Sequence, residues 1–234
     1  MYPIRRILNY NPIWQFDIPQ AYLTVNVPVG TGLQVTVGKF ATLLGYESFN
    51  AVSNSLYSHS YLFTNIPFTH TGIMGSYQIT DQLGMKLAVT RGWDVAMEDN
   101  NGAVDVLGRV SYKVNKQLSL DLNYSVGPED DRKIAPLGPV EKDVADNGHY
   151  RVAIDPIVRF QVNNALQLGL EFLYVFDGGV NEAIVRDNTN VGHAYGDFWG
   201  AALYAGYKIN NNFTVNGRLE YAHNFTDNIG EMRV

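Results

Sequence analysis

The chain has 234 residues, no cysteine and a formal net charge of −6 at pH 7. These values exclude a disulfide framework and argue against a basic surface that binds nucleic acid. The hydrophobic content of 46% excludes a disordered chain, and no run of about 18 consecutive apolar residues offers a transmembrane helix.

Residues 1–19 lack the long apolar core and the small-residue cleavage site of a secretory signal peptide. From residue 20 onward, apolar and polar residues alternate with a period of two, which predicts β-strands with one apolar face. In 103–114, the even positions are uncharged and the odd positions carry the charges. The same rule predicts about ten strands, at 20–27, 33–40, 68–79, 83–93, 103–114, 118–126, 149–162, 166–176, 198–209 and 213–222.

The connections between these strands alternate in length. Short connections lie near 28–32, 80–82, 115–117, 163–165 and 210–212, and longer polar ones at 41–67, 94–102, 127–148 and 177–197. One nine-residue phrase recurs at four short connections: YQITDQLGM (77–85), YKVNKQLSL (112–120), FQVNNALQL (160–168) and YKINNNFTV (207–215). It predicts a hairpin repeat whose Asn and Asp residues tolerate the positive φ of a tight turn.

Three architectures have strands of period two. Soluble sandwiches have strands of roughly 5–6 residues, shorter than these. A soluble lipocalin-like barrel buries its apolar face and seldom has long loops at one end only. A transmembrane barrel has long alternating strands, short turns on one side, long loops on the other and aromatic girdles. The sequence therefore predicts an all-β fold, an antiparallel up-and-down transmembrane β-barrel forming a single domain over residues 1–234.

Aromatic residues near the strand ends test this prediction. On the apolar face, four lie beside short turns and four beside long loops, although aromatic residues favour strands in any case. Arg91 is the exception on that face, near a rim where its side chain can reach water. The expected membrane-interface aromatics are Tyr77, Tyr112, Phe160 and Tyr207 on the short-turn side, and Trp93, Tyr150, Phe176 and Trp199 on the long-loop side.

The turn count adds an expectation about the whole barrel. Bacterial barrels place their short turns and both termini on the periplasmic side. Here the first and last predicted strands both reach the long-loop side, so at least one strand before Gln20 and one after Phe225 are expected to be missing from this sequence. The final residues, TDNIGEMRV, also lack the usual aromatic-ended last strand. We expect a fragment of a barrel of at least about twelve strands, which would also account for the absent signal peptide.

Two segments, 45–75 and 91–102, have a more distinctive sequence than the alternating strands. The first contains Gly-Tyr-Glu at 45–47, Tyr-Ser-His-Ser-Tyr-Leu-Phe at 57–63 and Pro-Phe-Thr-His-Thr-Gly at 67–72. With these motifs the chain resembles the OmpL-like β-barrel porins of Gram-negative bacteria. The second segment begins Arg-Gly-Trp-Asp at 91–94, and Arg91 stands where that family usually has Asn. The resemblance implies a porin-like protein of the outer membrane, without catalytic residues and without a settled substrate.

Charged residues fall on the polar face of the predicted strands. In a pore they would line the water-filled lumen and set ion preference, although they could equally brace the lumen by pairing with one another. The expected pore-lining residues are Lys86, Asp105, Arg109, Lys113, Asp121, Arg151, Asp155, Arg159, Glu171, Lys208, Arg218 and Glu220.

Segment 41–67 is too long for a plain turn, and its polar, aromatic and Ser-rich part could fold inward and narrow the lumen. An exposed surface loop is the alternative. Glu47, Tyr57, His59 and Tyr61 are the candidate constriction residues.

The five histidines show no metal-binding spacing, and Ser58–His59 adjacency is a poor indication of a nucleophile–base pair. We expect no metal, no cofactor and no enzymatic activity. The favoured function is passive diffusion of small hydrophilic solutes or ions; the alternatives are a plugged barrel (adhesin, structural anchor or lipid enzyme) and a soluble β-barrel binder. The expected partners are outer-membrane lipids and solutes, not nucleic acid, and a homo-oligomer is left open.

Overall fold

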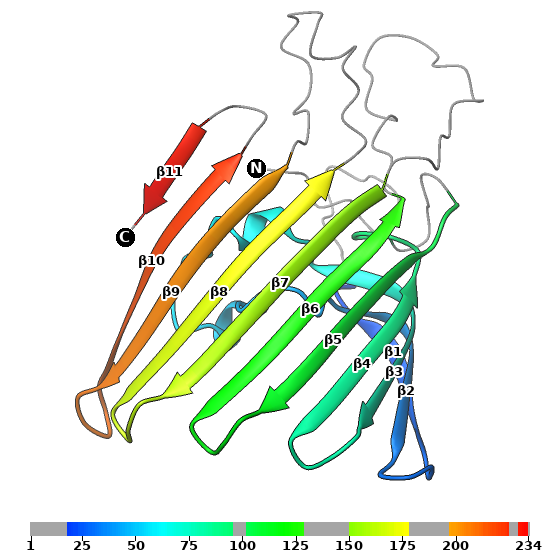
Figure 1. The fold of residues 1–234 in the computed structure, drawn as a ribbon, viewed down its shortest axis with the longest axis horizontal. Coiled ribbons are helices and arrows are strands. Elements are labelled where there is room, and N and C mark those ends of the chain that lie inside the picture. The colour runs from blue at the N-terminus through cyan, green and yellow to red at the C-terminus, as the bar shows by residue number, and fades with distance from the viewer. Residues whose placement is uncertain (1–17, 96–101, 129–149, 178–196, 225–228, 234) are drawn as a thin grey trace, which may run out of the picture.

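The computed structural model describes residues 18–95, 102–128, 150–177, 197–224 and 229–233. These residues form one antiparallel sheet of eleven strands in which each strand pairs with its neighbours along the chain (Figure 1). The strands are β1 (Ala21–Val27), β2 (Leu33–Ala41), β3 (Thr69–Gln78), β4 (Leu83–Thr90), β5 (Asp105–Lys113), β6 (Leu118–Pro128), β7 (Tyr150–Gln161), β8 (Leu166–Asp177), β9 (Phe198–Lys208), β10 (Thr214–Asn224) and β11 (Ile229–Arg233).

The predicted all-β, up-and-down architecture is confirmed, and β1 to β10 correspond to the ten predicted strands. The alternation rule does not predict β11, because its five residues (IGEMR) are too few to show a period. β11 pairs with β10, from Asn224 opposite Ile229 to Glu220 opposite Arg233. The turn count predicts that the strand after Phe225 is missing from the sequence, whereas Ile229–Arg233 form a strand there.

The four repeated turns share one hydrogen-bond arrangement. The side-chain oxygen of the fourth residue of each phrase accepts from the backbone N–H groups two and three positions later. Asn115 Oδ1 accepts from Gln117 and Leu118 at 2.8 and 2.9 Å. Asn163, Asn210 and, with a hydroxyl, Thr80 form the same pair of bonds.

The prediction that these turns use positive φ at Asn or Asp is wrong. Among the described non-glycine residues, only Asp94 has a positive φ, and it lies in a long connection. The phrase recurs because its fourth residue closes the turn through its side chain, as in an Asx-turn.

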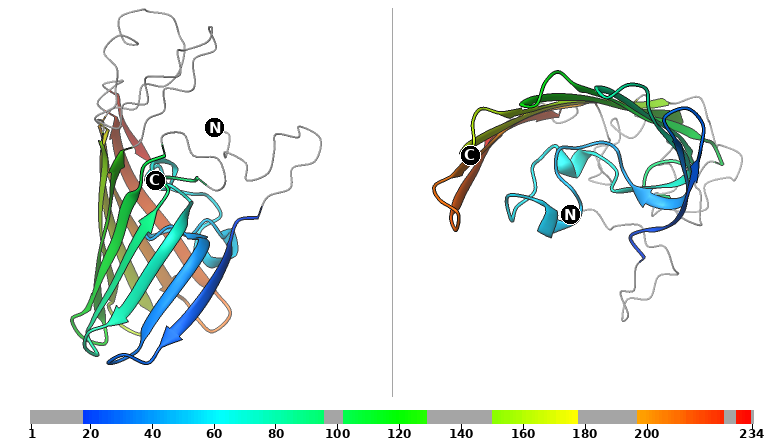
Figure 2. Two further views of the ribbon diagram at one scale, coloured as in Figure 1. Left: turned by 90° about the vertical axis from the view of Figure 1, so that its right-hand side faces the viewer. Right: turned by 90° about the horizontal axis from the view of Figure 1, so that it is seen from below.

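The two faces of the sheet differ in character. The sheet is curved, and the segment that carries the 3₁₀ turns η1 (Ala51–Ser53) and η2 (Phe63–Asn65) lies on its concave side (Figure 2). The convex face exposes large apolar side chains, among them Ile73, Leu87, Leu122, Ile154, Leu170, Leu203 and Leu219, each between 43% and 57% exposed. Such a continuous apolar surface is what a strand wall presents to lipid.

The buried apolar core lies between the concave face and the segment after β2. Leu44, Leu62 and Phe63 of that segment pack with sheet residues such as Leu107 and Leu173. Among the described residues, β1 and β11 are the two edges of the sheet and do not pair with each other, so the curved sheet is open.

In the described part of the chain, no helix has both the length and the apolar character needed to cross a membrane.

Introducing a charged residue on the convex face tests whether that face of the sheet contacts lipid. Leu170 lies on β8 with its side chain 47% exposed. Leu170→Arg should lower the free energy of unfolding in lipid vesicles by about 2–4 kcal/mol, because lipid does not solvate the guanidinium. Gln167→Arg, an exposed position on the concave face of the same strand, is the matched control and should unfold at nearly the wild-type urea concentration. Equal losses for the two variants would contradict the assignment of the faces.

Candidate functional site

The candidate site is the inner segment, defined as residues 42–68 between β2 and β3, together with the concave face of β5 to β10. The views in Figure 2 show the segment inside the curve of the sheet rather than over its rim. Three kinds of contact hold it there: side chains packed over strand glycines, backbone N–H groups donated to buried carboxylates, and arginine side chains of the sheet bound to Glu47 and to backbone carbonyls.

Tyr46 is seated over a glycine of the sheet. A Cβ atom built on Gly169 would lie 2.5 Å from the Tyr46 hydroxyl oxygen and 2.6 Å from its ring, so only glycine leaves room for this ring. The ring stacks on Tyr204 with centroids 4.1 Å apart, and the guanidinium of Arg159 lies 4.8 Å from the Tyr46 ring centroid. Such stacking and cation–π contacts fix the position of Tyr46.

Leu62 has a similar seat at the other end of the inner segment. It is fully buried, and a Cβ atom on Gly200 would lie 2.8 Å from its Cδ1 atom. Glycine inside a strand often marks such a close approach. The two glycines therefore define where the segment can dock.

Carboxylates of the sheet bind the backbone of the inner segment. Asp155 Oδ2 accepts from the Gly45 N–H at 2.6 Å and Glu171 Oε1 accepts from the Tyr46 N–H at 3.1 Å. Glu220 Oε2 accepts from the Tyr61 N–H at 2.7 Å. The three acidic residues are at most 2% exposed. A buried carboxylate requires such donors, and an irregular buried backbone requires such acceptors.

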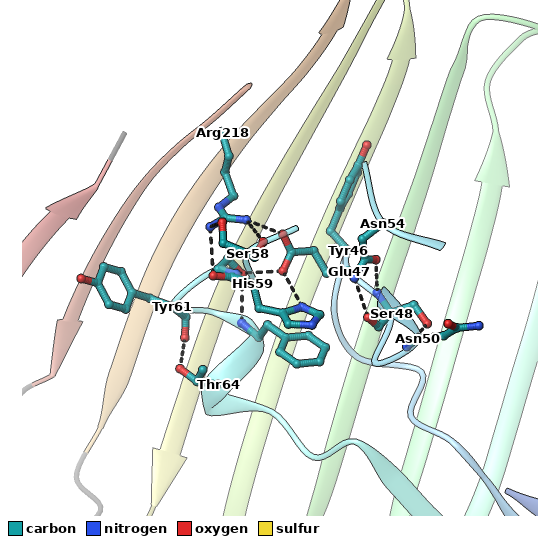
Figure 3. Close-up of polar contacts among 12 residues, drawn as sticks. Tyr46, Glu47, Ser48, Asn50, Asn54, Ser58, His59, Tyr61, Thr64 and Arg218 are labelled. Carbon is teal, nitrogen blue, oxygen red and sulfur yellow. Dashed lines mark hydrogen bonds and ion pairs between the residues drawn. The ribbon is translucent and has the colours of Figure 1, made fainter. Parts of the chain in front are cut away.

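A second cluster joins the inner segment to β10 through Arg218 and Glu47 (Figure 3). Arg218 Nη1 lies 2.7 Å from Glu47 Oε1, and Arg218 Nη2 lies 3.1 Å from Glu220 Oε1. Arg218 also donates to the carbonyl oxygens of Ser58 and His59, at 2.7 and 2.9 Å. One guanidinium thus bridges two carboxylates and two backbone carbonyls, which its planar fork of donors allows.

The second carboxylate oxygen of Glu47, Oε2, is bound within the inner segment. Glu47 Oε2 accepts from the Ser60 N–H at 2.8 Å and lies 3.3 Å from Nδ1 of His59. The His59 ring stacks on Phe63 with centroids 3.9 Å apart. Glu47 is 8% exposed, so its carboxylate has little access to water.

The ends of the inner segment are anchored as well. Arg109 donates to the Leu43 carbonyl and, at 2.5 Å, to Asn123 Oδ1. At the other end, Asp94 Oδ1 accepts from the Phe68 and Thr69 N–H groups at 2.9 and 2.8 Å. Burial raises the pKa of Asp94, and these hydrogen bonds partly oppose that rise.

The predicted pore-lining residues therefore divide into groups. Six of them contact the inner segment: Arg109, Asp155, Arg159, Glu171, Arg218 and Glu220. The others lie on the same face of the sheet. Asp105 and Arg151 are buried, Asp121 pairs with Arg159 at 2.5 Å, Lys86 is half-buried, and Lys113 and Lys208 are exposed.

The candidate constriction residues differ in their exposure to solvent. Glu47 is buried, and His59 and Tyr61 are partly buried against the sheet. Tyr57 is fully exposed.

The predicted interface aromatics lie on the convex face with one exception. Tyr112, Tyr150, Phe160, Phe176 and Tyr207 are exposed there, and Tyr77 and Trp199 are partly exposed.

The prediction for Trp93 is wrong, because its indole lies on the concave side. Trp93 Nε1 donates to Ser125 Oγ at 3.1 Å, and Arg151 lies over its ring at 5.0 Å. The alternation ends with β4 at Thr90, and the positive φ of Gly92 and Asp94 turns the chain inward.

The site also contains residues that sequence reasoning missed: Tyr46, Leu62, Asn123, Gly169 and Tyr204. One signal was present, since Tyr204 and Gly169 lie on the polar face of their strands, where an aromatic and a glycine are unexpected.

A cavity of about 580 Å³ lies between the inner segment and β7 to β10. Its lining is largely polar, and includes Tyr46, Glu47, Arg159, Gln161, Gln167, Lys208 and Asn216.

An up-and-down sheet with an apolar convex face and a charged concave face defines a porin-like transmembrane β-barrel protein. Residues 8–233 match the family described as "Putative beta-barrel porin-2, OmpL-like", and the chain belongs to this family. This membership supports a porin-like role. Comparison with curated proteins and with solved structures found no match.

The glycine seat of Tyr46 can be tested directly. Gly169→Ala should weaken docking of the inner segment by about 1–3 kcal/mol, because the new methyl group overlaps a ring held by Tyr204 and Arg159. Faster hydrogen exchange of the Gly45 and Tyr46 amides would report this loss. Gly217→Ala on β10 is the matched control, since a Cβ atom there meets nothing within 4 Å. Unchanged exchange in the Gly169 variant would contradict the proposed seat.

Proposed function

We propose that this protein is a channel of a Gram-negative outer membrane. Small hydrophilic solutes or ions diffuse down their gradient through a polar lumen, and the inner segment narrows that lumen. The concave face lines the passage, and the convex face contacts the membrane lipids. No covalent chemistry is part of this function.

The observation that carries the proposal is the position of the inner segment. It covers part of a charged concave face and leaves a polar cavity of about 580 Å³ beside it. A narrowed but polar passage suits diffusion of small hydrophilic molecules, because their hydration can be replaced by side chains as they pass. Membership of the porin family supports the same role.

The proposal includes closure of the sheet. A sheet edge exposes unpaired N–H and C=O groups, and these are costly in hydrocarbon. β1 and β11 therefore need further strand pairing in the membrane. Further strands that pair with these edges and close the barrel would provide it.

A plugged barrel is the second candidate, and it would serve as an adhesin, a structural anchor or a lipid enzyme. The observation that favours it is the dense docking of the inner segment by Asp155, Glu171, Arg218 and Glu220. Planar-bilayer recording of the purified protein separates the two. Discrete conductance steps support the channel, and a bilayer that stays sealed supports the plugged barrel.

Release of the inner segment should widen the passage. Arg218→Gln leaves Glu47 and Glu220 buried without their shared cation, which costs about 3–5 kcal/mol of docking energy. We expect larger and noisier single-channel conductance than in the wild type. Lys113→Gln removes one positive charge from an exposed position of the same face and is the control for charge alone. A conductance equal to that of the control would contradict a constricting role for the inner segment.

A further inference from the structure

We infer that the passage prefers anions, and that the solutes it admits best are small anions such as chloride and small carboxylates or phosphates. This inference rests on the proposed channel function. It follows from a difference in access to water between the acidic and the basic side chains of the concave face.

Four acidic side chains of this face are hidden from water. Asp105, Asp155, Glu171 and Glu220 are at most 2% exposed, and Glu47 of the inner segment is 8% exposed. A solute moving along the wall meets little of their surface.

The contacts of these acidic side chains explain why they are buried. Asp155, Glu171 and Glu220 each accept a backbone N–H from the inner segment, and Arg218 lies between Glu47 and Glu220. Their negative charges are therefore compensated within the docked structure, and their field toward the lumen is reduced.

Several basic side chains of the same face reach water, whereas Arg151 and Arg218 are buried. Lys113 and Lys208 are exposed, Lys86 is half-buried, and the side chain of Arg159 is 34% exposed. Asp121 keeps partial access, with 13% of its side chain exposed, and it is paired with Arg159. At the tips of the short turns, Asp81 and Lys116 are both exposed and offset each other.

Two of these cations lie in the cavity beside the inner segment. Arg159 and Lys208 line it together with the amides of Gln161, Gln167 and Asn216. Amide N–H groups and cations are donors that suit an anion. Glu47 also lines the cavity, but its two oxygens are bound by Arg218, Ser60 and His59.

A wall with exposed cations raises the local concentration of anions, because low-dielectric walls concentrate the field in a narrow passage. Fixed charge of one sign around a pore is a general source of ion selectivity. Docking of the inner segment thus sets the ion preference of the passage as well as its width. The docked segment covers Asp155, Glu171 and Glu220, and it leaves Lys113 and Lys208 exposed to water.

The test is the reversal potential of the full-length protein in a planar bilayer across a KCl gradient. The wild type should be more permeable to chloride than to potassium. A double variant, Lys113→Glu with Lys208→Glu, should lose this preference severalfold and move the reversal potential toward the potassium equilibrium potential. The matched control, Lys113→Arg with Lys208→Arg, keeps both charges and should reverse at the wild-type potential.

Higher salt should weaken the wild-type preference, because mobile ions screen charges that face water. A wild-type channel that prefers potassium, or a double variant that reverses at the wild-type potential, would overturn the inference and leave the channel function standing. Absence of any conductance would overturn the channel function itself. A shift in gel migration between unheated and heated samples would verify that each variant folds.

Discussion

The structure depends on the placement of carboxylates on the concave face, where they would be costly without donors. Asp155, Glu171 and Glu220 are nearly inaccessible to water, and the donors come from the backbone of the inner segment. The same bonds satisfy an irregular stretch of chain that has no strand partner. Each side therefore requires the other, so the wall and the inner segment form one unit.

The opposite face follows a different constraint. Convex side chains such as Leu122 and Leu203 are large, apolar and exposed, which is costly in water and favourable in lipid. With lipid outside, the residues that need water or hydrogen bonds can only lie inside the curve. The same alternation of residues that separates the two faces therefore also concentrates the charges around the inner segment.

Much of the fold could be predicted from the sequence, because alternation with period two reports directly on which face meets lipid. The ten predicted strands and the position of Tyr207 follow from that rule. Trp93 departs from it because positive φ at Gly92 and Asp94 reverses its direction. The contacts of the site could not be predicted, since they join positions far apart, such as Gly45 and Asp155, whose partnership depends on strand register and curvature.

The most direct test of the account is a distance between the inner segment and the sheet in lipid. The chain has no native cysteine, so spin labels can be placed at Val52→Cys in the segment and Asn211→Cys in the β9–β10 turn, both exposed positions. Pulsed dipolar spectroscopy should give one narrow distance distribution, which broadens when Arg218→Gln is added. A broad distribution in the protein without that substitution would contradict docking of the inner segment on the concave face.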